Sequence, residues 1–364
     1  MNKNINQNLN LLIITQKVDL NDDLLGFFHR WIEEFAKNFE KVIVICLQKG
    51  EYKLPQNVKV FSLGKEEYIH NLYHSHVIRR LVSLYRFYKY IFQERKNYNV
   101  VFIHMNSEYV ILGGLFWKVF NKKIFMWRNH PCGNFLTNIA VFLSDRVFCT
   151  SEYSYTAKFK KNEIMPAGID TETFKRFENI QRIPNSILYL GRISPIKNVD
   201  ILIEAANLLD KEGINFILNI VGEPGEKDKE YFEKIKKLAK DLEKKGKIKF
   251  LGKVPNYKTP EIYNQNEIFI NLTLSGSFDK TILEAMACEC LVLVANKSFE
   301  GVLPKEFIFN QGDFQDLASK LIWALKLSSS EKEKYGKDFR KYVMENHNLE
   351  TLIQKICKAY ESSN

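Results

Sequence analysis

Apolar, β-branched runs alternate with segments of helical periodicity along almost the whole chain, and this alternation limits the folds that it can adopt. Strands are expected at residues 11–15, 42–46, 58–62, 100–104, 124–127 and 147–150, and again at 187–190, 216–221, 248–251, 268–272 and 291–295. Helical periods fill most of the gaps, including 25–38, 77–94, 199–211, 229–244 and 280–288. Repeated strand–helix units predict an α/β fold of parallel sheets with helices on both faces.

The chain of 364 residues is long enough for two domains, and a polar stretch at residues 174–184 separates the two sets of expected strands. No run reaches the roughly 18 uninterrupted apolar residues of a membrane span. The run at 11–15 is too short for the apolar region of a signal peptide. Six scattered cysteines form no CxxC pair and predict neither a zinc site nor a disulfide framework. These features favour a cytoplasmic protein.

The net charge of +10 is concentrated in one part of the chain. Ten basic residues lie from Arg79 to Arg128, and only Glu94 and Glu108 oppose them. Such a segment favours an anionic partner, such as lipid headgroups, phosphates or nucleic acid, or is a solvated surface. The expected helix at 77–92 places apolar residues on one side and basic residues on another. That pattern is typical of a helix on an anionic bilayer or of an ordinary outer helix.

The strand–loop–helix at residues 187–206 carries the strongest chemical signal. Its apolar run ends at Gly191, and two cations, Arg192 and Lys197, follow before a helix begins. Open α/β sheets bind ligands at the carboxyl ends of their strands. A guanidinium and an ammonium there suit a nucleotide diphosphate and would stabilise the charge on a departing diphosphate. The alternative is an exposed pair of cations at a helix start.

A loop that opens a helix is the second candidate. The loop residues are Ser275, Gly276, Ser277, Phe278 and Asp279. Free amides at a helix N-terminus suit phosphate. Glu284 follows in an otherwise apolar helix, where a carboxylate is expected to be paired or to accept ligand hydroxyls such as those of a ribose. The alternative is an exposed helical glutamate.

Two histidines follow strands of the first set. His104 ends one expected strand, just before Asn106, and His130 follows the next. Imidazoles at this edge would bind sugar hydroxyls or transfer a proton, whereas a structural histidine is the alternative.

In these residues the chain resembles family 4 glycosyltransferases of the GT-B fold. Gly191, Arg192 and Lys197 resemble the donor diphosphate clamp of that family. Glu284 and the residues after it resemble the end of its paired-glutamate motif, whose second glutamate binds the donor ribose.

Further segments carry the same resemblance. Residues 166–170 resemble the P-x-G-I-D segment of the family, and Gly222 and Val254 lie in segments that resemble its nucleotide-pocket strand ends. His104 resembles a cleft histidine that many members hold near the transferred sugar.

The resemblance implies two Rossmann-like domains that face a central cleft. Residues 1–175 would bind the acceptor, together with a C-terminal helix at about 347–364 that crosses back, and residues 176–346 would bind the nucleotide-sugar donor. It also implies retention of anomeric configuration, no metal and no other cofactor.

Two positions depart from the family pattern. Gly276 stands where the first motif glutamate is expected, so either Asp279 supplies the missing carboxylate or loop amides hold the sugar. The glycine pair usual after the first strand is also absent. Residues 19–25 stand there instead, followed by Gly26, which we group with Asn106 and His130 as acceptor or cleft residues.

The combined interpretation is a metal-independent, retaining glycosyltransferase of the cytoplasm, peripheral on the inner face of the membrane. It would move a sugar from a nucleoside diphosphate sugar to a glycan or lipid-linked acceptor, in cell-envelope or polysaccharide biosynthesis, with Arg192, Lys197 and His104 as catalytic groups. A non-catalytic nucleotide-sugar-binding protein and a nucleotide-sugar epimerase on the same fold are the alternatives. Nucleic-acid binding ranks last, because the chain shows no stacking platform or base-reading motif.

Overall fold

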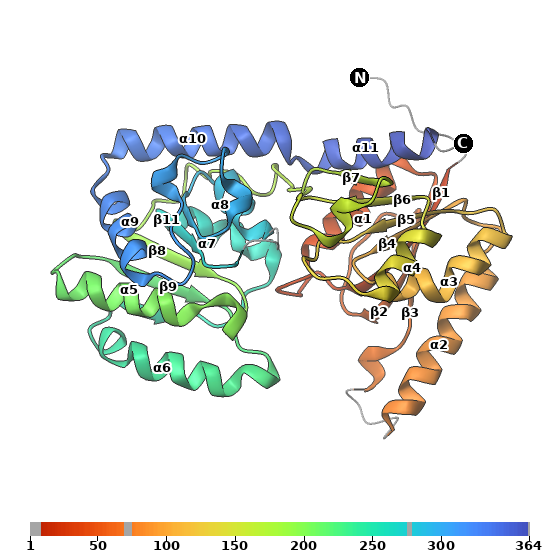
Figure 1. Cartoon of the computed structure of the whole chain (residues 1–364), viewed down its shortest axis with the longest axis horizontal. Coiled ribbons are helices and arrows are strands. Elements are labelled where there is room, and N and C mark those ends of the chain that lie inside the picture. Colours follow the sequence, from red (N-terminus) through yellow and green to blue (C-terminus); the bar gives the residue numbers. More distant parts are fainter. Residues whose placement is uncertain (1–8, 69–74, 275–278, 363–364) are drawn as a thin grey trace. The chain divides into compact units, whose positions relative to one another are not determined.

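The computed structural model describes residues 9–68, 75–274 and 279–362 and divides into two compact units. Unit 1 comprises Met1–Gly168 and Leu349–Asn364, and unit 2 comprises Ile169–Asn348. In each unit, helices cover a central sheet (Figure 1). None of the helices within the described ranges combines the length and the apolar character that a bilayer crossing requires.

Within the described residues, unit 1 holds a seven-stranded sheet in the order β3-β2-β1-β4-β5-β6-β7, with every pairing parallel. Its strands are β1 Asn10–Val18, β2 Lys41–Lys49, β3 Val58–Ser62, β4 Val100–His104, β5 Lys123–Trp127, β6 Arg146–Cys149 and β7 Asn162–Ile164. Its helices are α1 Phe27–Asn38, α2 His76–Gln93, α3 Ser107–Val119, α4 Phe135–Leu143 and α11 Leu349–Glu361.

The described part of unit 2 holds a five-stranded parallel sheet in the order β10-β9-β8-β11-β12. Its strands are β8 Ser186–Leu190, β9 Ile217–Val221, β10 Ile248–Phe250, β11 Ile268–Asn271 and β12 Leu291–Val294. Its helices are α5 Val199–Lys211, α6 Lys229–Lys244, α7 Thr259–Gln265, α8 Lys280–Ala287, α9 Phe314–Lys326 and α10 Ser329–Asn346. The predicted α/β class and parallel sheets are confirmed.

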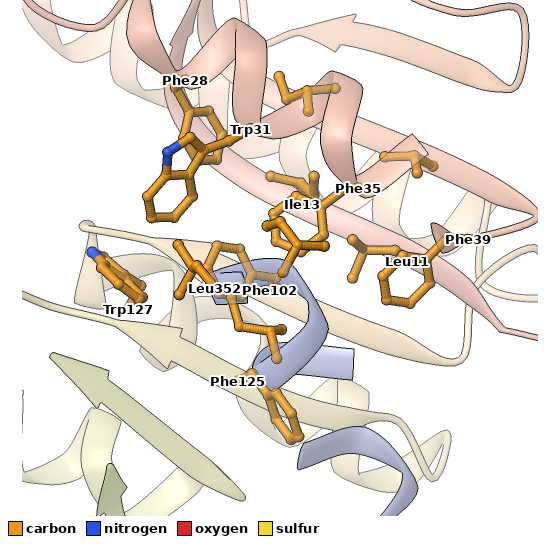
Figure 2. Close-up of a cluster of buried hydrophobic side chains, with 14 of the residues drawn as sticks. Leu11, Ile13, Phe28, Trp31, Phe35, Phe39, Phe102, Phe125, Trp127 and Leu352 are labelled. Atoms are coloured by element: carbon orange, nitrogen blue, oxygen red, sulfur yellow. The ribbon is translucent and has the colours of Figure 1, made fainter. Parts of the chain in front are cut away.

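Apart from the edge strands β3 and β7, the strands of unit 1 are largely buried on both faces, which explains why their sequences are continuous apolar runs. Along β1, Leu11 and Ile13 belong to one core with side chains of α1 and α11, whereas Leu12 and Ile14 belong to the core on the other face. Figure 2 shows the first of these cores, where Leu352 of α11 lies among the strand side chains. The predicted return of the C-terminal helix to the first domain is therefore confirmed.

The chain leaves unit 1 at Gly168, ahead of the expected boundary at residue 175. The intervening residues bond within unit 2: the Ile169 amide donates to the His347 carbonyl at 2.8 Å, and Arg340 donates to the Phe174 carbonyl at 3.1 Å. Gly168 has a φ of +70°, and a Cβ at this position would lie 2.5 Å from a Leu352 methyl carbon. Only glycine fits this turn without displacing α11.

The contribution of α11 to unit 1 can be tested with Leu352→Ala. Leu352 is fully buried, and the truncation removes apolar contacts and leaves a cavity, which typically costs about 2–5 kcal/mol. We expect the unfolding midpoint of unit 1 in urea to fall accordingly, followed by fluorescence of its buried tryptophans. Lys355→Ala, at an exposed position of the same helix, is the control, and equal midpoints for the two variants would contradict the packing role of α11.

Candidate functional site

The principal candidate lies at the carboxyl edge of the unit 2 sheet. The strand order reverses between β8 and β11, and open α/β sheets bind ligands at such a switch point. The segment after β8 carries Arg192 and Lys197, and the segment after β11 leads to Asp279 at the start of α8. Two segments that are far apart in the sequence thus meet at one point.

Lys197 and Asp279 form an ion pair that joins these two segments. The Lys197 ammonium lies 2.6 Å from Asp279 Oδ2 and donates a hydrogen bond to Thr273 Oγ1 at 2.9 Å. The Thr273 hydroxyl donates to the same carboxylate oxygen at 3.0 Å, and the Asn271 side-chain amide donates to it at 3.1 Å. These bonds fix the positions of the ammonium and the carboxylate.

Asp279 is held in its ionised form. Burial on its own raises the pKa of this carboxyl. The charge of Lys197 and hydrogen bonds from Lys197, Asn271 and Thr281 lower the pKa by more than burial raises it, so it lies well below its usual range. Asp279 also caps α8, because its Oδ1 accepts from the Thr281 amide at 3.3 Å. Its carboxylate is therefore already engaged by the protein.

Arg192 lies in the same loop, five residues before Lys197, and is exposed. The loop backbone is anchored: the Tyr189 hydroxyl donates to the Arg192 carbonyl at 2.9 Å, and the Ile193 amide donates to the Glu223 carbonyl at 3.1 Å. Across the described ranges, no side chain or carbonyl pairs with the Arg192 guanidinium. The guanidinium is thus available to an anionic ligand.

Glycines allow the strand ends to approach closely. Gly222 has a φ of +135°, and a Cβ there would lie 1.9 Å from the Gly191 carbonyl oxygen. The two backbones are joined by the hydrogen bond from the Gly191 amide to the Val221 carbonyl at 3.0 Å. Both glycines predicted to bind the donor therefore have a structural role as well.

Glu284 lies on α8 and is 3% exposed. Its carboxylate accepts from the Tyr263 hydroxyl at 3.1 Å and from the Asn256 side-chain amide at 3.4 Å. Burial raises the pKa of Glu284 to about 7, although Lys280 and these two hydrogen bonds lower it. Burial also lowers the pKa of Lys280, one turn earlier on the helix, to about 7. The predicted exposed-helix alternative does not describe this carboxylate.

The other predicted donor residues can be placed only in part. Ser275, Gly276, Ser277 and Phe278 lie outside the described residues. Val254 is half-buried in the segment that follows β10 and leads to Asn256.

Among the side chains of this site that sequence reasoning missed are Thr273, Asn256 and Tyr263. No local spacing marks them, since Tyr263 reaches Glu284 from a different helix, 21 residues earlier. A polar residue at the end of an apolar strand was the one available signal, and it applied to Thr273.

His104, expected near the reacting centre, is buried in unit 1 and 2% exposed. Its ring stacks on Phe28 with a centroid distance of 3.9 Å, and its Nδ1 lies 3.2 Å from Thr15 Oγ1. The Trp31 ring packs near the same imidazole, with a centroid distance of 5.7 Å. The ring therefore lies within the aromatic core beside α1, and its catalytic role stays a prediction.

The remaining predicted residues also follow strands of unit 1. Asn106 precedes α3, and its Oδ1 accepts from the Gln16 side-chain amide at 2.8 Å, which joins the segment after β4 to the carboxyl-terminal part of β1. These strands are neighbours at the switch point of this sheet. His130 is exposed after β5, where its Nδ1 accepts from the Cys132 amide at 3.0 Å, and Gly26 is buried just before α1.

Comparison with known proteins gives a consistent result. The sequence profile of the family described as glycosyl transferases group 1 matches residues 170–357. A D-inositol 3-phosphate glycosyltransferase of Frankia alni is 28% identical over 153 residues, which are 39% of this chain and 38% of that protein. An alpha-monoglucosyldiacylglycerol synthase of Streptococcus pneumoniae is 27% identical over 203 residues, 50% of this chain and 44% of that protein. The chain thus spans about two fifths of the length of these curated relatives.

The fold also has solved counterparts. The Anabaena protein Alr3699/HepE, solved in complex with UDP, has a TM-score of 0.75 at 16% identity and covers 97% of this chain and 100% of its own. This likeness shows the fold, which is the predicted GT-B type with two Rossmann-like domains.

The environment of Glu284 makes stability depend on pH. Because the pKa of Glu284 in the folded protein is about 7, above its ordinary value, its contribution to stability is present at low pH and is lost as the pH rises through 7. Relative to Glu284→Gln, we expect the wild type to lose about 2–3 kcal/mol between pH 5 and pH 8, measured by urea unfolding. Glu261→Gln, at an exposed position of α7, is the control. A constant difference between wild type and Glu284→Gln across this range would contradict the buried-carboxyl description.

Proposed function

The chain belongs to the glycosyl transferases group 1 family, and we propose that it transfers a sugar from a nucleoside diphosphate sugar to a glycan or lipid-linked acceptor. The observation that carries this proposal is the ion pair between Lys197 and Asp279 at the switch point of the unit 2 sheet, with the exposed Arg192 in the same loop as Lys197. The relatives named D-inositol 3-phosphate glycosyltransferase and alpha-monoglucosyldiacylglycerol synthase, and a fold neighbour in complex with UDP, support it.

In this proposal, Arg192 and Lys197 stabilise the leaving diphosphate. Arg192 offers a planar guanidinium that binds two phosphate oxygens at once, and Lys197 offers a point charge held in place by Asp279. An arriving diphosphate would share the Lys197 ammonium with Asp279. Two protein cations supply the positive charge, so the proposal includes no divalent metal.

Glu284 would accept the ribose hydroxyls of the donor. Its carboxylate is buried, and burial raises its pKa to about 7, which favours the neutral carboxyl more than in an exposed glutamate. Hydroxyl donors favour the ionised form, so donor binding would displace the proton. The proposal further includes retention of anomeric configuration, a role for His104 beside the transferred sugar, and a place in cell-envelope or polysaccharide synthesis. These three parts rest on the family resemblance.

The clamp can be tested with Arg192→Ala and Lys197→Ala in an assay of sugar transfer from UDP- and GDP-sugars. Removing one group that stabilises transition-state charge typically costs about 2.7–4 kcal/mol, or 10²–10³ in kcat. We expect losses of this size, with Lys211→Ala, an exposed cation of unit 2, as the control. Activity should persist in EDTA.

Unchanged turnover in Arg192→Ala would overturn the clamp, and loss of activity in EDTA with recovery on adding Mg²⁺ would overturn metal independence. Donor binding without transfer or hydrolysis would favour a non-catalytic binding protein. Interconversion of free donors without an acceptor would favour an epimerase.

We also propose that unit 1 binds an anionic membrane surface through α2 and α3, on the inner face of the membrane. The two helices lie side by side, and the Tyr88 hydroxyl of α2 donates to the Leu112 carbonyl of α3 at 3.0 Å (Figure 1). Both expose apolar side chains, here called the α2–α3 apolar surface: Val77, Ile78, Leu81, Tyr85, Tyr88, Phe92, Leu112, Leu115 and Val119.

Basic side chains border this surface. Arg80, Lys89 and Lys118 are exposed on the same two helices, within the segment that carries ten basic and two acidic residues. Each cation close to an anionic bilayer contributes about 1 kcal/mol, and the apolar side chains add their own burial. A surface with both apolar and basic groups is better suited to contact with an anionic bilayer than to exposure to water alone.

Liposome co-sedimentation tests the membrane proposal. We expect the protein to sediment with vesicles that contain phosphatidylglycerol, less at high salt, and much less with phosphatidylcholine alone. The double variant Tyr85→Ser, Leu115→Ser should lower vesicle affinity at least about tenfold, because two exposed apolar contacts are lost. Tyr52→Ser is the control, since Tyr52 is an exposed aromatic in the loop after β2. Equal sedimentation with both vesicle types, or none with either, would contradict the proposal.

A further inference from the structure

Unit 1 contains a cavity of about 900 Å³ on the side of its sheet that α2 and α3 cover. Leu47 of β2 and Leu63, just after β3, lie at the carboxyl edge of the sheet, and α2 contributes its amino-terminal half up to Phe87. The cavity also reaches Asn106, at the switch point between β1 and β4. Its volume falls within the range of small-molecule sites, roughly 300–1,000 Å³.

One part of the cavity wall is apolar and closely packed against the rest of unit 1. Leu63 and Phe87 are each 1% exposed, and the Phe87 ring packs against Tyr109 at a centroid distance of 5.3 Å. Leu84, half-buried one turn before Phe87, extends this wall. An apolar ligand group that binds here would be transferred out of water without displacing any polar contact of the protein, which is favourable.

The other part of the wall is basic. Lys65, Arg79 and Arg80 line the cavity, with Glu108 as the opposing carboxylate and His76 nearby. Lys65 and Arg80 are exposed, and in the chain as described neither forms an ion pair.

By contrast, Arg86 of the same helix does not line the cavity. Its guanidinium is held by both carboxylate oxygens of Glu67, at 2.7 and 2.9 Å. Unlike Arg86, Lys65 and Arg80 are thus not held by a carboxylate of the described residues.

We propose that this cavity binds the acceptor, and that the acceptor is an anionic amphiphile. Its apolar group would occupy the wall around Phe87, and its phosphate would lie between Lys65 and Arg80, since guanidinium and ammonium groups suit phosphate oxygens. A purely polar glycan would leave the apolar wall unfilled, and a neutral lipid would leave the cations unmatched. The inference rests on the proposed sugar transfer and specifies its acceptor class.

Calorimetric titration with octyl phosphate below its micelle concentration tests this inference. We expect binding to the wild-type chain that is at least tenfold tighter than that of octyl glucoside or inorganic phosphate. Arg80→Gln should weaken octyl phosphate binding roughly tenfold by removing a charge-assisted contact, and Leu84→Trp should abolish it by filling the cavity. Arg80 is exposed, so its substitution leaves the packing intact and the test does not depend on the tryptophan variant.

Two controls on the same helix separate the cavity from its outer surface. Lys89→Gln and Leu81→Trp change exposed residues of α2 that do not line the cavity, so octyl phosphate binding should be unchanged in both. Equal binding of octyl phosphate and octyl glucoside, or unchanged affinity in both cavity variants, would overturn the inference. Binding of inorganic phosphate as tight as that of octyl phosphate would identify a free-anion site and overturn it too. If the protein binds anionic vesicles but not monomeric octyl phosphate, the lipid contact belongs to the outer surface, and the inference is overturned as well.

Titration with UDP- and GDP-sugars in the same variants keeps this inference distinct from the proposed function. Donor binding and donor turnover without octyl phosphate binding would overturn the acceptor class alone. Octyl phosphate binding without any donor binding would instead overturn the proposed transfer, and with it the identification of the ligand as an acceptor.

Discussion

Parallel pairing forces each strand of the two sheets to be followed by a crossover that returns the chain to the opposite edge, and these crossovers cover both sheet faces with helices. The strands must then bury both faces, as β1 does with Leu11 and Leu12 in different cores. All carboxyl ends of one sheet meet at a single edge. The loops at that edge carry the candidate site residues of both units.

At the carboxyl edge of the unit 2 sheet, the charged side chains are held in position by the protein itself. Lys197 is held by Asp279 and Thr273 before any ligand arrives, and Asp279 is itself held by Asn271 and Thr281. In the proposed mechanism, a fixed ammonium would lose little conformational freedom on binding a diphosphate, which is the advantage of preorganised charge. The cost is that Asp279 competes for the same ammonium, and the exposed Arg192 supplies a charge without such a competitor.

The sequence was sufficient for the fold because the fold depends on periodicity. Every predicted strand is present, and α5 and α6 begin and end at the predicted residues, since amphipathic helices between buried strands have clear limits. β7 was not predicted, because Asn162 and Glu163 give it no apolar run. The structure also divides the chain at Gly168, because the next residues bond to the end of α10 rather than to unit 1.

The site was less accessible to sequence reasoning because it depends on tertiary contacts. Arg192, Lys197 and Glu284 were chosen from their places after strands or in an apolar helix. Whether Glu284 is buried depends on Tyr263, which lies on another helix, and no spacing rule connects the two. In the same way, Asp279 was expected as a donor-binding residue or a substitute carboxylate, but its pairing with Lys197 follows only from the adjacency of β8 and β11.

Helix α2 shows most clearly why an apolar period does not by itself identify a core face. The apolar side predicted from its period consists of Ile78, Leu81, Tyr85, Tyr88 and Phe92, and all five are more than 40% exposed. The helix is fully buried only at Phe87 and Ile91, on its other side. A stripe of five apolar residues in water is unfavourable, and contiguous apolar patches of this kind mark interaction surfaces. The cavity lies on the inner side of the same helix, so α2 separates an apolar outer surface from a partly apolar interior.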